Sequence, residues 1–201
     1  MLTVIGISDH YGRAELVTIA AANGGAPAIL DRRQARLIAA SLPGAPYHHQ
    51  ALEIPLADAE ELIARVKASV AEHCRAALAE LRSAFSADAV VLQRSPYARL
   101  PDSLAEILAS RPLTNAADGM LYREALADAA RDLGMLVDRY PRKSDQAAEA
   151  AQALGVARET VDALIARFGS EVGVPWRKDH KDAAASALRF LAERSSLRVD
   201  A

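Results

Sequence analysis

The N-terminal segment, residues 1–33, constrains the fold of this chain more than any other part. Two β-branched runs, Leu2–Ser8 and Ala14–Ala22, are separated by "DHYGR", which has the length and the glycine of a hairpin loop. The turn signal "NGG" at Asn23–Gly25 precedes a third run, Pro27–Arg33. Three short strands joined by tight turns predict an antiparallel meander at the start of the chain.

After the meander the hydrophobic period changes. Apolar residues recur at helical spacing through Ala57–Phe85, which predicts a long amphipathic helix. The pattern further predicts a buried strand at Asp88–Pro96, a short helix in "PDSLAEILASRP", a helix at Asp118–Gly134, a last strand at Met135–Pro141 and a final helix at Lys178–Ser195. A meander followed by alternating helices and strands predicts one α/β domain over residues 1–201, with a mixed sheet and helices on its faces.

Composition narrows the class of protein. Half of the residues are apolar, which is enough for a sizeable core, and the net charge of −2 excludes a large basic field. The 24 lysines and arginines still allow a smaller basic patch. The single cysteine, Cys74, lies in a helical run and is interpreted as a small buried hydrophobe. Without a signal peptide, a spanning segment or a possible internal disulfide, we expect a soluble cytoplasmic protein with no membrane contact.

The stretch "AAEAAQALGVARETVDALIARFG" has two interpretations. An Ala-rich helix, a turn at Gly155 and a second helix carrying Val161 and Leu164 form the pattern of a DNA-binding helix-turn-helix over residues 147–168. Alternatively, the same helices pack within a larger fold, and their apolar positions serve that packing.

The element order resembles the RNase H-like fold, and the last third of the chain is similar to its RuvC-type branch, which includes Holliday-junction resolvases. The motifs that carry this resemblance are "LVDRYPRKSDQAAEAAQALGVARETVDALIARFG" and "DHKDAAASAL". In that branch, a last strand ending in a proline loop is followed by a helix, a glycine turn, another helix and a final helix with a D-x-x-D-A start. The resemblance implies a three-strand meander plus two further strands, helices on both faces, and a helical segment 143–170 inside the domain.

The resemblance also implies a metal-dependent phosphodiester endonuclease. Such chemistry needs clustered carboxylates that hold two divalent cations, Mg²⁺ or Mn²⁺. Asp179 and Asp182 are three residues apart, on one face at a helix start. With Asp9 they are the candidate catalytic and metal-binding acids, and Glu124 is the candidate fourth ligand. The alternative interpretation is that Asp179 and Asp182 only cap and solvate the helix.

Two positions depart from the family pattern. The first strand of the family ends in Gly-Ile-Asp, whereas this chain has "GISD", so Ser8 takes that position and the acid follows at Asp9. One residue changes the face of a strand, so Asp9 reaches the site only if the strand ends or bulges there. Gln93 stands where the family has a strand glutamate. These departures favour the alternative of a catalytically inactive RNase H-like binding or scaffold protein.

Basic residues follow the predicted strand ends and flank the final helix start. Their placement indicates phosphate contacts with nucleic acid; the candidates are Arg94, Arg99, Arg142, Lys143, Arg177 and Lys178. Ser8, Gln93, His10 and His180 are candidate auxiliary residues. For His180, a partly exposed helix position is the competing interpretation. The long helix Ala57–Phe85 could carry the apolar face of a homodimer.

Overall fold

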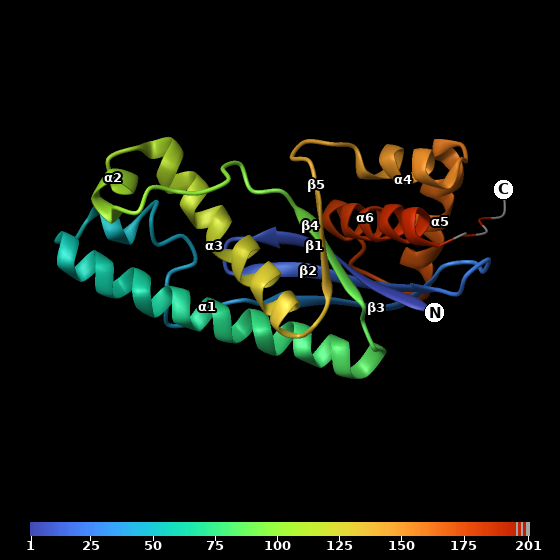
Figure 1. The fold of residues 1–201 in the computed structure, drawn as a ribbon, viewed down its shortest axis with the longest axis horizontal. Coiled ribbons are helices and arrows are strands. Elements are labelled where there is room, and N and C mark those ends of the chain that lie inside the picture. Colours follow the sequence, from blue (N-terminus) through green and yellow to red (C-terminus); the bar gives the residue numbers. More distant parts are fainter. Residues whose placement is uncertain (196, 198, 200–201) are drawn as a thin grey trace.

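The computed structural model describes residues 1–195, 197 and 199. Among these residues, five strands form one mixed sheet in the order β3-β2-β1-β4-β5 (Figure 1). β1 (Leu2–His10), β2 (Arg13–Ala21) and β3 (Ala28–Arg36) are the antiparallel meander, and β4 (Ala89–Gln93) and β5 (Leu136–Tyr140) extend the sheet in parallel from β1. The predicted α/β class and the three-plus-two strand arrangement are confirmed.

β1 continues past the predicted end at Ser8. Its pairing with β2 runs without interruption from Leu2 opposite Ala21 to His10 opposite Arg13. Because the strand neither ends nor bulges before His10, the side chains of Ser8 and His10 share one face of the sheet and Asp9 lies on the other.

Helices cover both faces of the sheet. α1 (Leu56–Phe85) and α3 (Arg111–Asp132) cover one face, and α4 (Gln146–Leu154), α5 (Arg158–Val172) and α6 (Lys178–Arg194) lie on the other. The buried stripe of α1 explains its position, since an apolar residue recurs about every fourth place. Its members are Leu62, Val66, Val70, Cys74, Leu78 and Leu81. Cys74 is fully buried, as expected.

α1 and α3 project beyond the sheet, and α2 (Leu104–Leu108) and the short 3-10 helix η1 (Gln50–Leu52) complete that end (Figure 1). A separate small core there includes Tyr47, Ile63 and Ala117. None of the helices described is long and apolar enough to cross a membrane.

The prediction for α3 was wrong at its start, because the helix begins at Arg111 and not at Asp118. The extra turns contain Asn115, which has low helix propensity, and they begin with Pro112 in the first turn, where proline is tolerated. Tertiary contacts stabilise them: Asp118 accepts hydrogen bonds from the backbone N–H groups of Tyr47 and His48, both at 3.0 Å. These partners lie too far away in the sequence for a local pattern to reveal them.

Candidate functional site

The start of α6 lies next to the end of β1 because Gly6 allows a close approach. A Cβ atom on Gly6 would lie 1.8 Å from the carbonyl oxygen of Ala183. Only glycine therefore lets the α6 backbone rest directly on β1. This contact places Asp179 and Asp182, in the first turns of α6, beside the sheet face that carries Ser8 and His10.

His10, and not Asp9, contacts the predicted acidic helix. Its Nε2 lies 3.0 Å from Oδ2 of Asp179, and both side chains are about one-third exposed. Asp182, one turn further on, forms an ion pair with Lys178 on the same helix. The structure thus brings together Ser8, His10, Asp179 and Asp182 at one end of the sheet.

Asp9 points to the opposite face and binds Arg123 of α3. The Arg123 Nε atom donates to Oδ1 at 3.1 Å and lies 3.0 Å from Oδ2, and the Asp9 side chain is only 4% exposed. Burial raises the pKa of the Asp9 carboxyl, and the adjacent guanidinium opposes that rise. Asp9 is therefore a buried, charge-paired carboxylate on the side of α3, away from Asp179.

Glu15 is an acid of the α6 face that the sequence analysis missed. It lies directly opposite Ser8 in the β1–β2 pair and is buried. Its carboxylate contacts Nε2 of His180 at 3.1 Å and accepts a hydrogen bond of 2.6 Å from Gln34. The alternation of side chains along β2 could have revealed this acid, because it places Glu15 on the same face of the sheet as Val17.

His180 is a buried link between α6 and the sheet, so the interpretation of a partly exposed helix residue was wrong. It is 3% exposed, and its Nδ1 accepts a hydrogen bond of 3.0 Å from the backbone N–H of Arg177. Nε2 then carries the proton, and it lies 3.1 Å from Oε2 of Glu15. The ring also stacks on Trp176, with centroids 5.7 Å apart. His180 thereby fixes the first turn of α6 over β2.

Glu124 belongs to a different cluster, on the α3 side. Its carboxylate is bound by Arg139 of β5 at 2.6 Å and by the Ser95 hydroxyl. Gln93, the last residue of β4, lies on the α6 face, because it alternates with the buried Leu92 of the α1–α3 core. Glu124 and Gln93 therefore end on opposite faces of the sheet.

The carboxylates at this end of the sheet do not fit a two-cation centre. Every one of the five has a partner within the protein, as the preceding contacts show: Asp9 with Arg123, Glu15 with His180, Glu124 with Arg139, Asp179 with His10 and Asp182 with Lys178. Among the residues that the structure describes, no group of three His, Cys, Asp or Glu side chains is arranged to hold a metal ion. The acids are spread over both faces, and each lies against a partner side chain of the protein itself.

Exposed cations surround the same end. We call it the carboxyl end of the sheet, because β1, β4 and β5 finish there at His10, Gln93 and Tyr140. The exposed basic residues at this end are Arg13, Arg36, Arg94, Arg142, Lys143, Arg177, Lys178 and Lys181. Arg99 is set apart: it pairs with Asp102 in the segment before α2.

The α4–α5 pair is packed into the domain. α5 buries Val161, Leu164, Ile165 and Phe168 in the core that it shares with α6 and the sheet. Its first residue, Arg158, is paired with Asp145 and Asp162. A helix whose apolar face is buried in this way, and whose first cation is paired, is poorly suited to reading a major groove.

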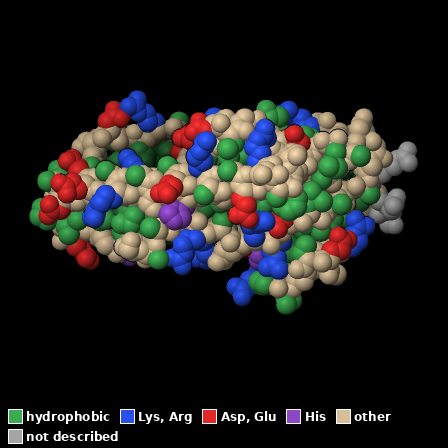
Figure 2. Space-filling view, turned by 90° about the horizontal axis from the view of Figure 1, so that it is seen from below, with side chains coloured by type: hydrophobic (Ala, Val, Ile, Leu, Met, Phe, Trp, Pro, Cys, Tyr) green, Lys and Arg blue, Asp and Glu red, His purple; other side chains and the backbone are tan. Residues whose placement is uncertain are grey.

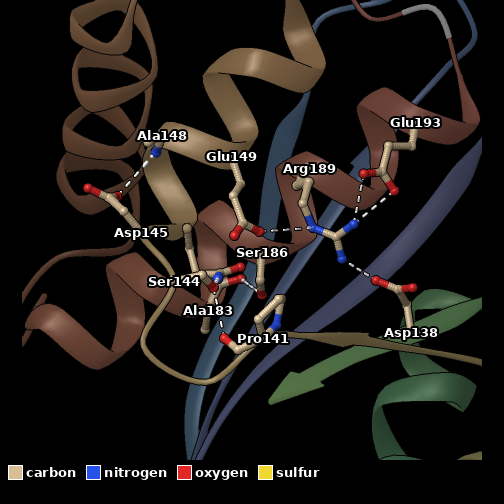
Figure 3. A network of polar contacts seen from close by, with 11 residues as sticks. Asp138, Pro141, Ser144, Asp145, Ala148, Glu149, Ala183, Ser186, Arg189 and Glu193 are labelled. Atoms are coloured by element: carbon tan, nitrogen blue, oxygen red, sulfur yellow. Dashed lines mark hydrogen bonds and ion pairs between the residues drawn. The ribbon is translucent and has the colours of Figure 1, made fainter. Parts of the chain in front are cut away.

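A second polar network fixes α4 and β5 to α6. Figure 3 shows the Arg189 guanidinium between Asp138 of β5, Glu149 of α4 and Glu193 of α6. The Arg189 side chain is 12% exposed. This cluster joins β5, α4 and α6 to one another.

No protein-family model and no curated protein matches the chain. Solved structures do match. Thermus thermophilus RuvC is 16% identical with a TM-score of 0.54, over 96% of this chain and 95% of that one. T. thermophilus RuvC in complex with a Holliday junction substrate is 18% identical with a TM-score of 0.53, over 98% of both chains. The yeast mitochondrial Holliday junction resolvase Ydc2 is 14% identical with a TM-score of 0.52, over 95% of this chain and 78% of that one. Identity at this level establishes the fold alone, and the chain has the RNase H-like fold of the RuvC type.

Proposed function

We propose that this chain binds nucleic acid at the carboxyl end of the sheet and does so without a divalent cation. The observation that carries the proposal is the charge arrangement there. Each carboxylate is paired with an internal donor, while cations such as Arg94, Arg142 and Arg177 are exposed around them. Unpaired arginine and lysine side chains that follow strand ends are suited to phosphate oxygens.

The surface along α1 is a poor candidate for nucleic-acid binding. Along α1, acidic and basic side chains are interspersed without a large patch of one sign (Figure 2). The exposed residues of that helix carry charges of both signs, as in Glu61, Arg65, Lys67 and Glu72. A mixed surface offers little net attraction for a polyanion.

The fold's neighbours suggest the form of nucleic acid to test first. One of the similar structures is a complex with a Holliday junction substrate. We therefore infer that a four-way DNA junction is a suitable first ligand for this chain, alongside linear duplex and single strands.

A fluorescence anisotropy titration tests the proposal. Labelled junction, duplex and single strand are titrated at several salt concentrations, once with EDTA and once with Mg²⁺. We expect binding in EDTA, no gain in affinity on addition of Mg²⁺, and a linear fall of log K with log salt concentration. Arg94→Gln and Arg142→Gln should each weaken binding and reduce the salt slope by about one unit.

Arg194→Gln is the matched control, because Arg194 is an exposed arginine at the last residue of α6, and only the first turns of that helix lie at the carboxyl end of the sheet. It should leave both affinity and slope unchanged. Absence of binding at low salt, or binding that depends on Mg²⁺, would overturn the proposal.

A second candidate function is metal-dependent cleavage. It is favoured by the position of Asp179 and Asp182, which share one face of α6 beside the end of β1. The test is incubation of the junction with Mn²⁺ or Mg²⁺ and separation of the strands on a denaturing gel. Cleavage that disappears in Asp182→Asn would establish this function and overturn the metal-free proposal.

A further inference from the structure

A cleft of about 630 Å³ opens where the first turns of α4, α5 and α6 converge. One wall is the segment Lys143–Ala147, which leads from the loop after β5 into the first residues of α4. The other walls come from α5, from its first residue as far as Ala166, and from the start of α6. The volume falls within the usual range of small-molecule sites, about 300–1,000 Å³.

The charges of the cleft favour an anion. Its lining contains the cations Lys143, Arg158, Lys178 and Lys181 and the carboxylates Asp145, Asp162 and Asp182. Arg158 is occupied by Asp145 and Asp162, and Lys178 by Asp182. Lys143 and Lys181 are exposed and form no ion pair with another described residue, so they are available to a ligand. The first residues of α4, α5 and α6 all line this space.

The remaining lining offers an apolar wall and a buried polar group. Ala147, Ile165 and Ala166 form the apolar part. Gln146 also lines the cleft and is 3% exposed; its amide nitrogen donates to the Ser144 hydroxyl at 2.5 Å. Its buried amide oxygen lacks a hydrogen-bond partner within the described part of the protein. A buried acceptor without a donor costs about 1–3 kcal/mol, which a ligand N–H or O–H would offset.

We propose that this cleft binds a nucleotide through a terminal phosphate. The phosphomonoester lies between Lys143 and Lys181, and the sugar and base lie against Ile165 and Ala166. A phosphomonoester carries about −1.5 to −2 charges at neutral pH. That is more than the single charge of a phosphodiester, so two free lysines favour a strand end over a continuous backbone. The inference rests on the proposed function where the nucleotide is the end of a bound strand, and a free nucleotide offers the same chemistry.

Competition and direct-binding measurements distinguish a strand end from a free nucleotide as the ligand of the cleft. The full-length protein is titrated with matched single strands that end in a 5′-phosphate, a 3′-phosphate or two hydroxyl groups, and separately with a nucleoside monophosphate. We expect about tenfold tighter binding of one phosphorylated strand than of the hydroxyl strand, from one or two charge-assisted contacts. A nucleoside monophosphate that binds and displaces that strand identifies the same cleft.

Two variants test whether the preference for a phosphorylated strand arises in this cleft. Lys143 has a positive φ of 67°, so Lys143→Asn removes its charge while keeping a residue that tolerates this conformation. Lys181→Gln removes the other free charge from an exposed position. Each should abolish most of the preference for the phosphorylated end. Because both lysines also belong to the cations at the carboxyl end of the sheet, each should weaken the hydroxyl strand about as much as Arg94→Gln does. Arg94→Gln, outside the cleft, should weaken both strands equally and preserve the preference.

The outcomes distinguish this inference from the proposed function. Equal binding of phosphorylated and hydroxyl strands, with no binding of the mononucleotide, overturns the cleft assignment and leaves strand binding intact. Mononucleotide binding that Lys143→Asn removes, with no binding of any strand, supports the cleft and overturns the proposed function. A phosphate preference that survives both variants places it elsewhere and overturns the inference.

Discussion

Arg123 Nε of α3 lies 3.0 Å from Oδ2 of Asp9 at the end of β1, across the face opposite to the His10–Asp179 contact. The pair is nearly buried, with side chains 14% and 4% exposed. Taking one partner away leaves the other charge buried and uncompensated, which is more costly than the net contribution of the pair itself.

Arg123→Met should therefore lower the free energy of unfolding by about 3–5 kcal/mol. The double variant Asp9→Asn, Arg123→Met should recover much of this loss, because neither charge is then stranded. Urea denaturation measures both. Arg131→Gln is the matched control: Arg131 lies on the same helix, is 53% exposed, and should cost at most about 1 kcal/mol. Equal losses for Arg123→Met and Arg131→Gln would contradict this account of the buried pair.

The sequence predicted the succession of strands along the chain, because turn residues and hydrophobic periods are local signals. It also predicted that Asp9 would face away from the site unless β1 ended early. The sequence could not say where β1 ends, since that depends on pairing with β2 as far as Arg13. The partner of Asp9 was equally hidden, because Arg123 is 114 residues away in the chain.

Glu15 and His180 were missed as a pair for the same reason. Each occupies an ordinary position in its own element, and only the docking of α6 over β2 brings them together. Motif resemblance located the acidic helix but could not reveal which donors neutralise its acids. Those partners come from other elements, as His10 does, or from the same helix, as Lys178 does.

Gly6→Ala tests the close contact between β1 and α6. The added methyl would overlap the Ala183 carbonyl oxygen at 1.8 Å, and both groups belong to buried backbone. We expect a loss of at least about 1–3 kcal/mol from overpacking, with displacement of α6. Because α6 carries Lys178 and Lys181, affinity for nucleic acid should fall as well.

Gly44→Ala is the comparison variant for Gly6→Ala. A Cβ there would meet no atom closer than 3.6 Å, which is ordinary van der Waals contact. Its stability should stay within about 0.5 kcal/mol of the parent protein. A Gly6→Ala protein with unchanged melting temperature and unchanged affinity would show that α6 does not need this contact.

Arg189→Met tests the cluster that joins β5, α4 and α6 (Figure 3). It removes the guanidinium from Asp138 and leaves three carboxylates near one another, so we expect a loss of about 2–4 kcal/mol. Glu193→Gln removes only the most exposed of the three carboxylates and should cost less than about 1 kcal/mol. Chemical denaturation of the two variants side by side gives the comparison, and similar losses in both would argue against a central role for Arg189.

Asp118 should make stability depend on pH. Burial raises the pKa of this carboxyl to about 6, although the backbone N–H groups of Tyr47 and His48 oppose the rise. In the unfolded chain the group titrates near about 3.9. Between these values the folded protein holds a proton that the unfolded chain has released. The associated stability is therefore fully present below about pH 4 and is lost as pH rises through about 6.

The total change is on the order of 3 kcal/mol, since one pKa unit corresponds to about 1.4 kcal/mol. Unfolding free energies of the parent protein and of Asp118→Asn, measured between pH 4 and pH 7.5, isolate this contribution as a difference in slope. Asp128→Asn, at a 69% exposed position on the same helix, should keep the slope of the parent. The slope is the informative quantity, because asparagine has one oxygen for two backbone donors and Asp118→Asn is expected to be less stable at every pH. Parallel curves for the parent and Asp118→Asn would mean that this carboxyl is ionised throughout the range, and that its two backbone hydrogen bonds outweigh its burial.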